Sequence, residues 1–348
     1  MKAYPASIIR CISALPLALV ASLLIADSSG TLSGRYITLA IQGDLRAAEK
    51  LFEGSELHTE ADLELKQEFK ERFLDQPGPG ADLNRDKELA DELAVAFRSY
   101  WRDGLLGKLN QTEAENRLSA DLEKIRMAHT GASIADVGER NSFPGQALVD
   151  AGFYFLDTVT PPHRDLFIWR EQSSTRYRVQ LTDVSIAVTV NFIDDFVIQG
   201  WKEYASLGLA ATTGWVENGE LFCVAWAYDT AAEDFAVSYL KHEARHLVDL
   251  QKYPDMQPVE LEYRAKLTEL SYAHSSLKRI LDDFRIKSAD NPDSAHAMAN
   301  WQVTRDLYRK LNGTEIPEDW AGWEYPDTGR VNRIARELLE ENTRRHEI

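Results

Sequence analysis

Hydrophobic positions recur at three- and four-residue spacing through the first part of the chain, from Tyr36 to about Ile125. Stretches such as KELADELAVAFRSYWRDGLLGKL and EAENRLSADLEKI place their apolar residues on one face, which predicts amphipathic helices. The stretch DQPGPGA, from Asp75 to Ala81, interrupts the pattern with proline and glycine. We therefore expect residues 30–150 to form a helical N-terminal region.

The hydrophobic period changes at about Thr175. The stretch RYRVQLTDVSIAVTVNF is rich in Val, Ile, Thr and aromatic residues and alternates as a strand does. LAATTGWVENGELFCVAWAYD predicts two strands joined at Glu217-Asn218-Gly219, because Asn-Gly favours a tight hairpin turn. After Asp229 the pattern is helical again. This order predicts an α+β fold that is predominantly helical with a small antiparallel sheet, and residues 151–348 would form a second domain.

The N-terminus has the pattern of an export signal. Lys2 and Arg10 precede the apolar run CISALPLALVASLLIA, and the polar stretch DSSG follows it. The run is short for a membrane span and contains a proline. We expect residues 1–29 to be a signal peptide cleaved between about Ala26 and Ser28. The mature chain would then be exported, periplasmic or secreted, without a stable membrane span. A retained membrane anchor is the alternative.

Composition restricts the possible partners. The chain of 348 residues has a formal net charge of -17, which argues against nucleic acid, since phosphate binding needs clustered Lys and Arg. Hydrophobic residues make up 44% of the chain, enough for a sizeable core. Removal of the signal would take Cys11 with it, so Cys223 would have no intramolecular disulfide partner and is expected to be a small buried apolar residue. The sequence does not indicate an oligomeric state.

The residues that suggest chemistry lie in SYLKHEARHLVDLQKYPDMQPVELEYRAKLTEL. His242 and His246 are one helical turn apart, about 6 Å along the axis, so both can bind one metal ion. Glu243 falls beside Leu240 and Leu247, where a carboxylate is unfavourable unless something requires it. A zinc ion would lower the pKa of a bound water, and Glu243 would accept the proton as general base. The alternative is a pair of solvated or capped histidines.

Neighbouring residues predict the limits of this helix. The spacing in Thr230–Glu233 is that of a capping box, so the helix is expected to begin near Ala231. Pro254 ends it at about Tyr253. The helical period places one group of basic residues on a face that we expect to be exposed: Lys241, Arg245 and Lys252.

Zinc needs a third protein ligand and an open position for water. Pro258 is expected to begin the next helix after a tight connection. The glutamates of that helix, Glu260, Glu262 and Glu269, all compete for this role on spacing alone. Those that do not bind metal would lie on a solvated face or form ion pairs.

The His-Glu-x-x-His motif followed by a glutamate on the next helix resembles the gluzincins, the thermolysin-like and related zinc peptidases. The resemblance covers Leu221–Tyr272 and implies a zincin-like catalytic core, a Zn²⁺ cofactor and a peptide or protein substrate. In that family the second-helix glutamate has a small residue three positions later, as Glu262 has Ala265. The resemblance therefore implies that Glu262 completes the zinc ligands with His242 and His246.

Further residues are expected to support this site. Asp249 would suit a role in orienting a ligand histidine through its free N–H. A donor besides zinc is needed for the oxyanion, and we choose His296 as the catalytic residue for this role. The resemblance also implies an edge strand that binds substrate backbone, and we expect Leu221–Tyr228 to be that strand. The other candidates for the oxyanion donor are Tyr253, Tyr272 and His274.

The sequence thus predicts an exported zinc metallopeptidase in which Glu243 and His296 are catalytic. One competing interpretation is a zinc-binding scaffold or interaction protein without protease activity. Another is a zinc hydrolase that does not act on peptides.

Overall fold

The computed structural model describes residues 22–25, 31–53, 59–75, 88–131, 143–291, 294–317 and 327–347. The predicted cleavage region and most of the proposed signal peptide lie outside these residues. The apolar run contributes only Ser22–Ile25, which forms strand β1.

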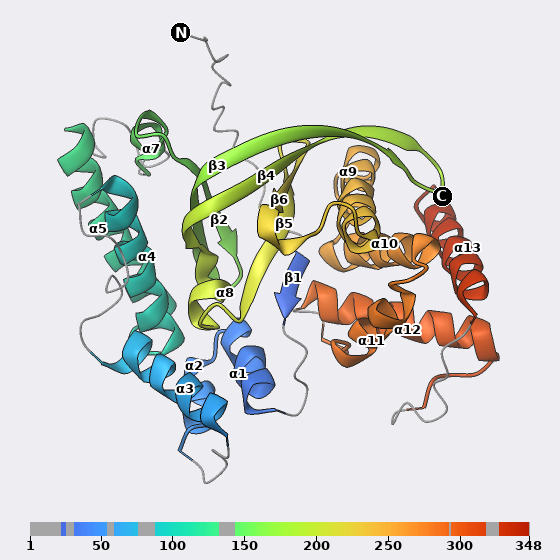
Figure 1. The fold of residues 1–348 in the computed structure, drawn as a ribbon, viewed down its shortest axis with the longest axis horizontal. Coiled ribbons are helices and arrows are strands. Elements are labelled where there is room, and N and C mark those ends of the chain that lie inside the picture. The colour runs from blue at the N-terminus through green and yellow to red at the C-terminus, as the bar shows by residue number, and fades with distance from the viewer. Residues whose placement is uncertain are drawn as a thin grey trace.

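Helices make up the first part of the described chain after β1 (Figure 1). Capping residues define several of their starts: the side chains of Asp44, Thr59 and Asn110 each accept a backbone N–H three residues on. These elements are α1 (Leu32–Ile41), α2 (Leu45–Lys50), α3 (Glu60–Phe69), the π-helical turn η1 (Lys70–Leu74), α4 (Leu89–Leu105), α5 (Gln111–Thr130) and α7 (Gly145–Asp150).

A curved sheet follows, in the order β1-β5-β6-β4-β3-β2. Its remaining strands are β2 (Tyr154–Thr160), β3 (His163–Gln180), β4 (Ser185–Gln199), β5 (Ala210–Glu217) and β6 (Glu220–Val224), with helix α8 (Gly200–Ala205) between β4 and β5. The α+β, predominantly helical class is confirmed. The expectation of a purely antiparallel sheet is wrong for one pair, because β6 enters the sheet beside β4 in the parallel direction.

The hairpin β3–β4 joins two parts of the molecule. Its strands of 18 and 15 residues pair from Phe167↔Gln199 to Gln180↔Ser185. Figure 1 shows the hairpin arching from the N-terminal helices to the C-terminal helices. Its tip closes where the N–H of Leu181 donates to the carbonyl of Val184 at 2.9 Å.

The C-terminal part is helical. It consists of the short 3₁₀ turn η3 (Ala225–Ala227), the π-helical turn η4 (Phe235–Lys241), α9 (His242–Lys252), α10 (Pro258–Tyr272), α11 (Leu277–Ile286), α12 (Ala295–Asn312) and α13 (Thr328–His346). Helix α10 lies among these helices, and its Leu267 and Leu270 are fully buried. Burial of each such side chain contributes about 1.5–3 kcal/mol.

A separate apolar cluster lies between the sheet and the start of α9. It includes Val190 of β4, Cys223 of β6, Tyr239 of η4 and Ala244 of α9, all fully buried. This cluster fixes α9 against the strands that precede it. Cys223 is a buried residue, as expected, and has a free thiol.

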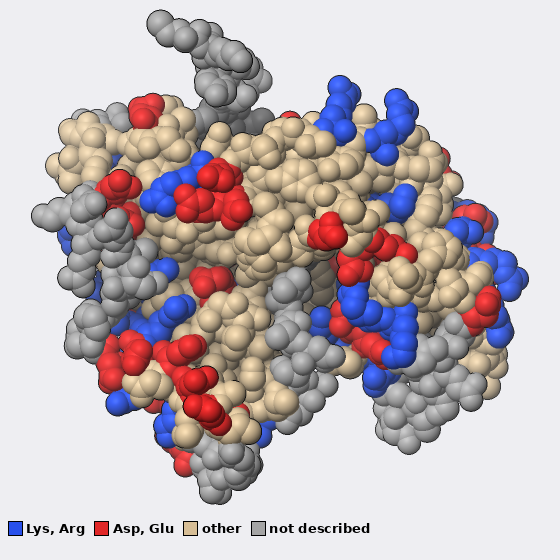
Figure 2. All heavy atoms as spheres, in the orientation of Figure 1, with Lys and Arg blue, Asp and Glu red and all other residues tan. Residues whose placement is uncertain are grey.

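On the surface, Figure 2 shows Lys and Arg side chains interspersed with Asp and Glu on the face in view. Among the residues that the structure describes, no helix combines the length and the apolar character needed to cross a membrane.

Candidate metal centre

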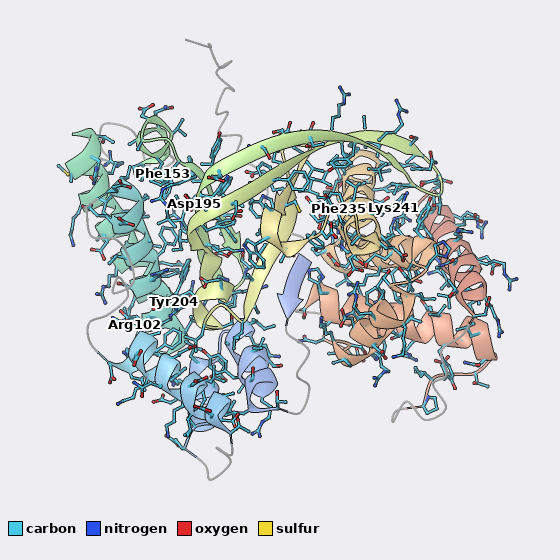
Figure 3. All side chains as sticks on the ribbon, viewed as in Figure 1. Arg102, Phe153, Asp195, Tyr204, Phe235 and Lys241 are labelled. Carbon is cyan, nitrogen blue, oxygen red and sulfur yellow. The ribbon has the colours of Figure 1, made fainter. Side chains whose placement is uncertain are left out.

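The histidine helix begins later than its sequence suggests. Helical structure starts at Glu233 and passes through η4, whose end residues Phe235 and Lys241 are labelled in Figure 3. The predicted capping box is wrong, because Glu233 binds elsewhere. Its carboxylate accepts the backbone N–H groups of His274, Ser275 and Ser276, and both serine hydroxyls, just before α11. The helix ends at Lys252, before Pro254, as expected.

Three side chains from α9 and α10 meet at one point. Glu262 Oε2 lies 3.7 Å from His242 Nε2, and Glu262 Oε1 lies 3.5 Å from His246 Nε2. One donor atom from each of the three residues lies within 4.8 Å of the others. Pro258 occupies the first turn of α10, as expected, and Ala265, three positions after Glu262, is fully buried. The structure therefore brings together the three residues that the sequence suggested as ligands.

The atoms of these residues that could bind a metal ion are buried and have no hydrogen bonds. His242, His246 and Glu262 are at most 3% exposed. His242 Nε2, His246 Nε2 and Glu262 Oε1 have no hydrogen-bond partner in the described part of the chain. Each such atom costs free energy, because water no longer solvates it. An ion bound between the three side chains would satisfy all of these atoms, and imidazole nitrogen and carboxylate oxygen are donors that zinc accepts.

Glu269 has a role that the sequence analysis did not assign. Its Oε1 lies 2.7 Å from His242 Nδ1. Since a carboxylate accepts, Nδ1 carries the proton and the lone pair of Nε2 faces the cluster. Glu269 thus orients His242 rather than joining the three converging donors. The sequence could have indicated that Glu269 lies near the site, because it is seven residues after Glu262 and shares its helix face.

Asp249 does not orient a histidine, and that expectation is wrong. Its two oxygens accept from Arg264 Nε and Nη2 at 2.7 and 2.9 Å, and Oδ1 also accepts from Arg245 Nη1 at 3.2 Å. Arg245, which we expected on an exposed face, is fully buried. Its other contact is Asp183 at the tip of the β3–β4 hairpin. The arginines therefore neutralise a buried aspartate and connect the hairpin to α9.

His296 lies beside the cluster, at the start of α12. Its Nδ1 is 2.8 Å from Glu262 Oε2, and 41% of its side chain is exposed. Lys266 Nζ lies 3.6 Å from the same oxygen. His296 is therefore both in contact with a candidate ligand and open to solvent.

The other oxyanion candidates have different contacts. His274 is exposed, and its backbone N–H donates a hydrogen bond to Glu233. Lys241 lies over the ring of Tyr272, and Tyr253 packs against His346.

Glu243 is fully buried on the side of α9 that faces the sheet. Its charge acts on Cys223 and Tyr239. Burial, with a contribution from this charge, raises the pKa of Cys223 to about 12. Glu243 also acts on His242. A carboxylate in an apolar cluster is thus next to the converging donors, as the sequence suggested.

Burial and charge set the protonation of the cluster. Burial lowers the pKa of His246. Burial acts in the same direction on His242, but the hydrogen bond and charge of Glu269 outweigh it and raise the pKa of that ring. Burial favours neutral Glu262, but the charges of His296 and His242 hold its pKa well below the usual range. An ionised Glu262 and a neutral His246 are the forms that bind metal.

The prediction that Leu221–Tyr228 is an edge strand for substrate binding is wrong. β6 lies between β5 and β4 and pairs with both, so its backbone groups are not free to bind a peptide. The chain also leaves the strand conformation after Val224 and enters η3. The Glu217-Asn218-Gly219 prediction is confirmed: β5 and β6 are joined at Asn218 and Gly219, both with positive φ.

Comparison of this chain with protein-family models, with curated proteins and with solved structures found no match. The functional conclusion therefore rests on the geometry of His242, His246 and Glu262.

Proposed function

We propose that this chain is a zinc metallopeptidase of gluzincin type, in which His242, His246 and Glu262 hold the ion. One observation carries the proposal: three buried side chains direct nitrogen and oxygen atoms without hydrogen bonds toward a common point. A purely structural zinc site more often has four protein ligands, whereas two histidines and one glutamate leave a position open for water.

The bound zinc would polarise a water molecule and the peptide carbonyl. Residues of the chain would transfer the proton, bind the oxyanion and orient a ligand. Glu243 would accept the proton that the attacking water loses and pass it to the leaving amine, which breaks the C–N bond. His296 is partly exposed, and its Nδ1 faces Glu262. In its protonated form it would donate the N–H of its other ring nitrogen, Nε2, to the carbonyl oxygen as negative charge develops there. Glu269 would keep the His242 ring in place.

The Glu243→Gln variant tests this proposal. Glutamine has nearly the shape of glutamate, and position 243 is not a ligand, so zinc should stay bound. Because the amide cannot accept the proton, hydrolysis of a peptide library should fall by about a hundredfold or more. The melting temperature should not fall, since a neutral group replaces a buried carboxylate. Glu337→Gln, at an exposed position on α13, is the matched control.

The outcomes separate the competing functions. Zinc-loaded Glu243→Gln with full activity would contradict the general-base role. A chain that binds zinc but hydrolyses no peptide, with a lower melting temperature in Glu243→Gln, would indicate a scaffold. Turnover of non-peptide esters or amides alone would indicate a different zinc hydrolase.

Export belongs to the same proposal. The basic start, the short apolar run and the polar stretch after it support removal of residues 1–29. Mass spectrometry of exported protein should find a chain that begins near residue 30, and an intact Met1 would count against the proposal.

A further inference from the structure

The edge of the sheet nearest the metal helix is occupied by the chain's own N-terminal segment. β1 pairs antiparallel with β5, with Leu23, Leu24 and Ile25 opposite Thr212, Ala211 and Ala210. Within the described sheet, β1 is the only strand that pairs with Ala210–Thr212, because β6 pairs only with Gly214–Glu217. Figure 1 shows β1 along the outer side of β5. Without β1, the backbone N–H and C=O groups of Ala211 would lose their strand partner. The backbone groups of Ala210 also bond to the Ser206 hydroxyl, and the Thr212 carbonyl accepts from the Gln199 side chain.

This edge lies next to the candidate metal centre. Gly214, which is opposite Ser22 of β1, is also opposite Cys223 of β6, and the charge of Glu243 acts on Cys223. Neighbouring strands are about 4.8 Å apart, so β1 is two strand spacings from Cys223. A Cβ atom at Gly214 would come within 2.4 Å of the Tyr239 ring, three residues before His242. β5 therefore packs directly on the start of the metal helix.

The pairing is also weak enough to be exchanged. β1 has only four residues, and its register is irregular between Ser22 and Leu23. A strand this short contributes few backbone hydrogen bonds, and an extended peptide can replace it on the same edge.

We propose that Ser22–Ile25 is an internal blocking strand: it occupies the edge of β5 where an extended peptide substrate would bind, and so lowers the peptidase activity of the unprocessed chain. This inference rests on the proposed peptidase function. It assigns substrate docking to β5 in place of β6. Displacement or removal of the segment would open Ala210–Thr212 to a peptide.

A cross-link in the full chain tests whether β1 is seated on β5. Leu24→Cys with Ala211→Cys joins residues that face each other, in a Cys11→Ser background. The native Cys223 is buried and its pKa is raised to about 12, so it should not react. Leu24→Cys with Glu217→Cys, farther along β5, is the control. We expect a disulfide in the first pair and none in the control. Ile25→Cys with Ala210→Cys repeats the test at the next paired position, and no disulfide in either pair would overturn the inference.

Peptide turnover tests the blocking role. Oxidation of the cross-linked pair should reduce turnover to the level of zinc-loaded Glu243→Gln, and reductant should restore it. Leu24→Pro, which removes a backbone donor from β1, should raise turnover severalfold, whereas Ser28→Pro should not. Equal turnover with and without the disulfide would overturn the inference and leave the proposed function intact. A disulfide that forms in a chain with no turnover in any state would instead show that the proposed function is wrong.

Discussion

His242 uses its two ring nitrogens for different partners. Nδ1 is fixed by Glu269 at 2.7 Å, and Nε2 faces His246 and Glu262 with no hydrogen bond in the described part of the chain. This division is what a metal ligand requires, because the outer hydrogen bond sets the tautomer and aims the lone pair.

The role of Glu269 is testable apart from that of the ligands. Glu269→Ala should lower zinc affinity by about ten- to hundredfold, because the His242 ring loses its orienting acceptor. Glu260→Gln is the control on the same helix, since Glu260 binds Asn342 and His346 instead. Titration with a competing chromophoric chelator measures both variants. An unchanged zinc affinity in Glu269→Ala would show that the contact with His242 does not position a ligand.

The four-residue spacing of His242 and His246 was sufficient to predict that they share a helix face, since that follows from the helical period. The environment of Asp249 was not predictable in this way. Its partner Arg264 lies on another helix, and the buried Arg245 also pairs with Asp183 at the tip of the distant hairpin. Local periodicity carries no information about such long-range contacts.

At the scale of elements, local signals predicted turns better than they predicted the helix start. Asn218-Gly219 needs positive φ at both residues, so the sequence fixes that hairpin. Thr230–Glu233 has the spacing of a capping box, yet Glu233 instead joins the start of η4 to the turn before α11. Three backbone N–H groups and two hydroxyls are a better set of donors than one N-cap amide.

This contact predicts a pH dependence of stability. Hydrogen bonds from Ser275, His274 and Ser276 outweigh the effect of burial and lower the pKa of Glu233 from 4.5 to about 2. A depressed folded-state pKa stabilises the fold above pH 4.5, and this contribution is lost as the pH falls through about 2. The free energy of unfolding of wild type should therefore decrease more steeply over this range than that of Glu233→Gln.

Urea denaturation at intervals between pH 4.5 and 2 measures this difference. Glu337→Gln, at an exposed position on α13, should keep the wild-type slope. The same slope for wild type and Glu233→Gln would mean that the carboxylate does not stabilise the folded state.

For the whole molecule, the fold class followed from the order of the patterns, but the strand order did not. The sequence placed β5 and β6 next to each other and before α9, and it correctly predicted a predominantly helical α+β fold. It could not show that β6 enters beside β4 in the parallel direction or that Ser22–Ile25 covers β5. Pairing between distant strands depends on tertiary packing, which no local period encodes.

The zinc content of the purified chain tests the central claim most directly. We predict one zinc ion for each chain, and its loss in both His246→Ala and Glu262→Ala, because each change removes one of three protein ligands. Elemental analysis of wild type, these two variants and Glu269→Ala after dialysis measures the zinc content. A wild-type chain without zinc affinity would contradict the account. So would a Glu262→Ala variant that keeps its zinc while Glu269→Ala loses it.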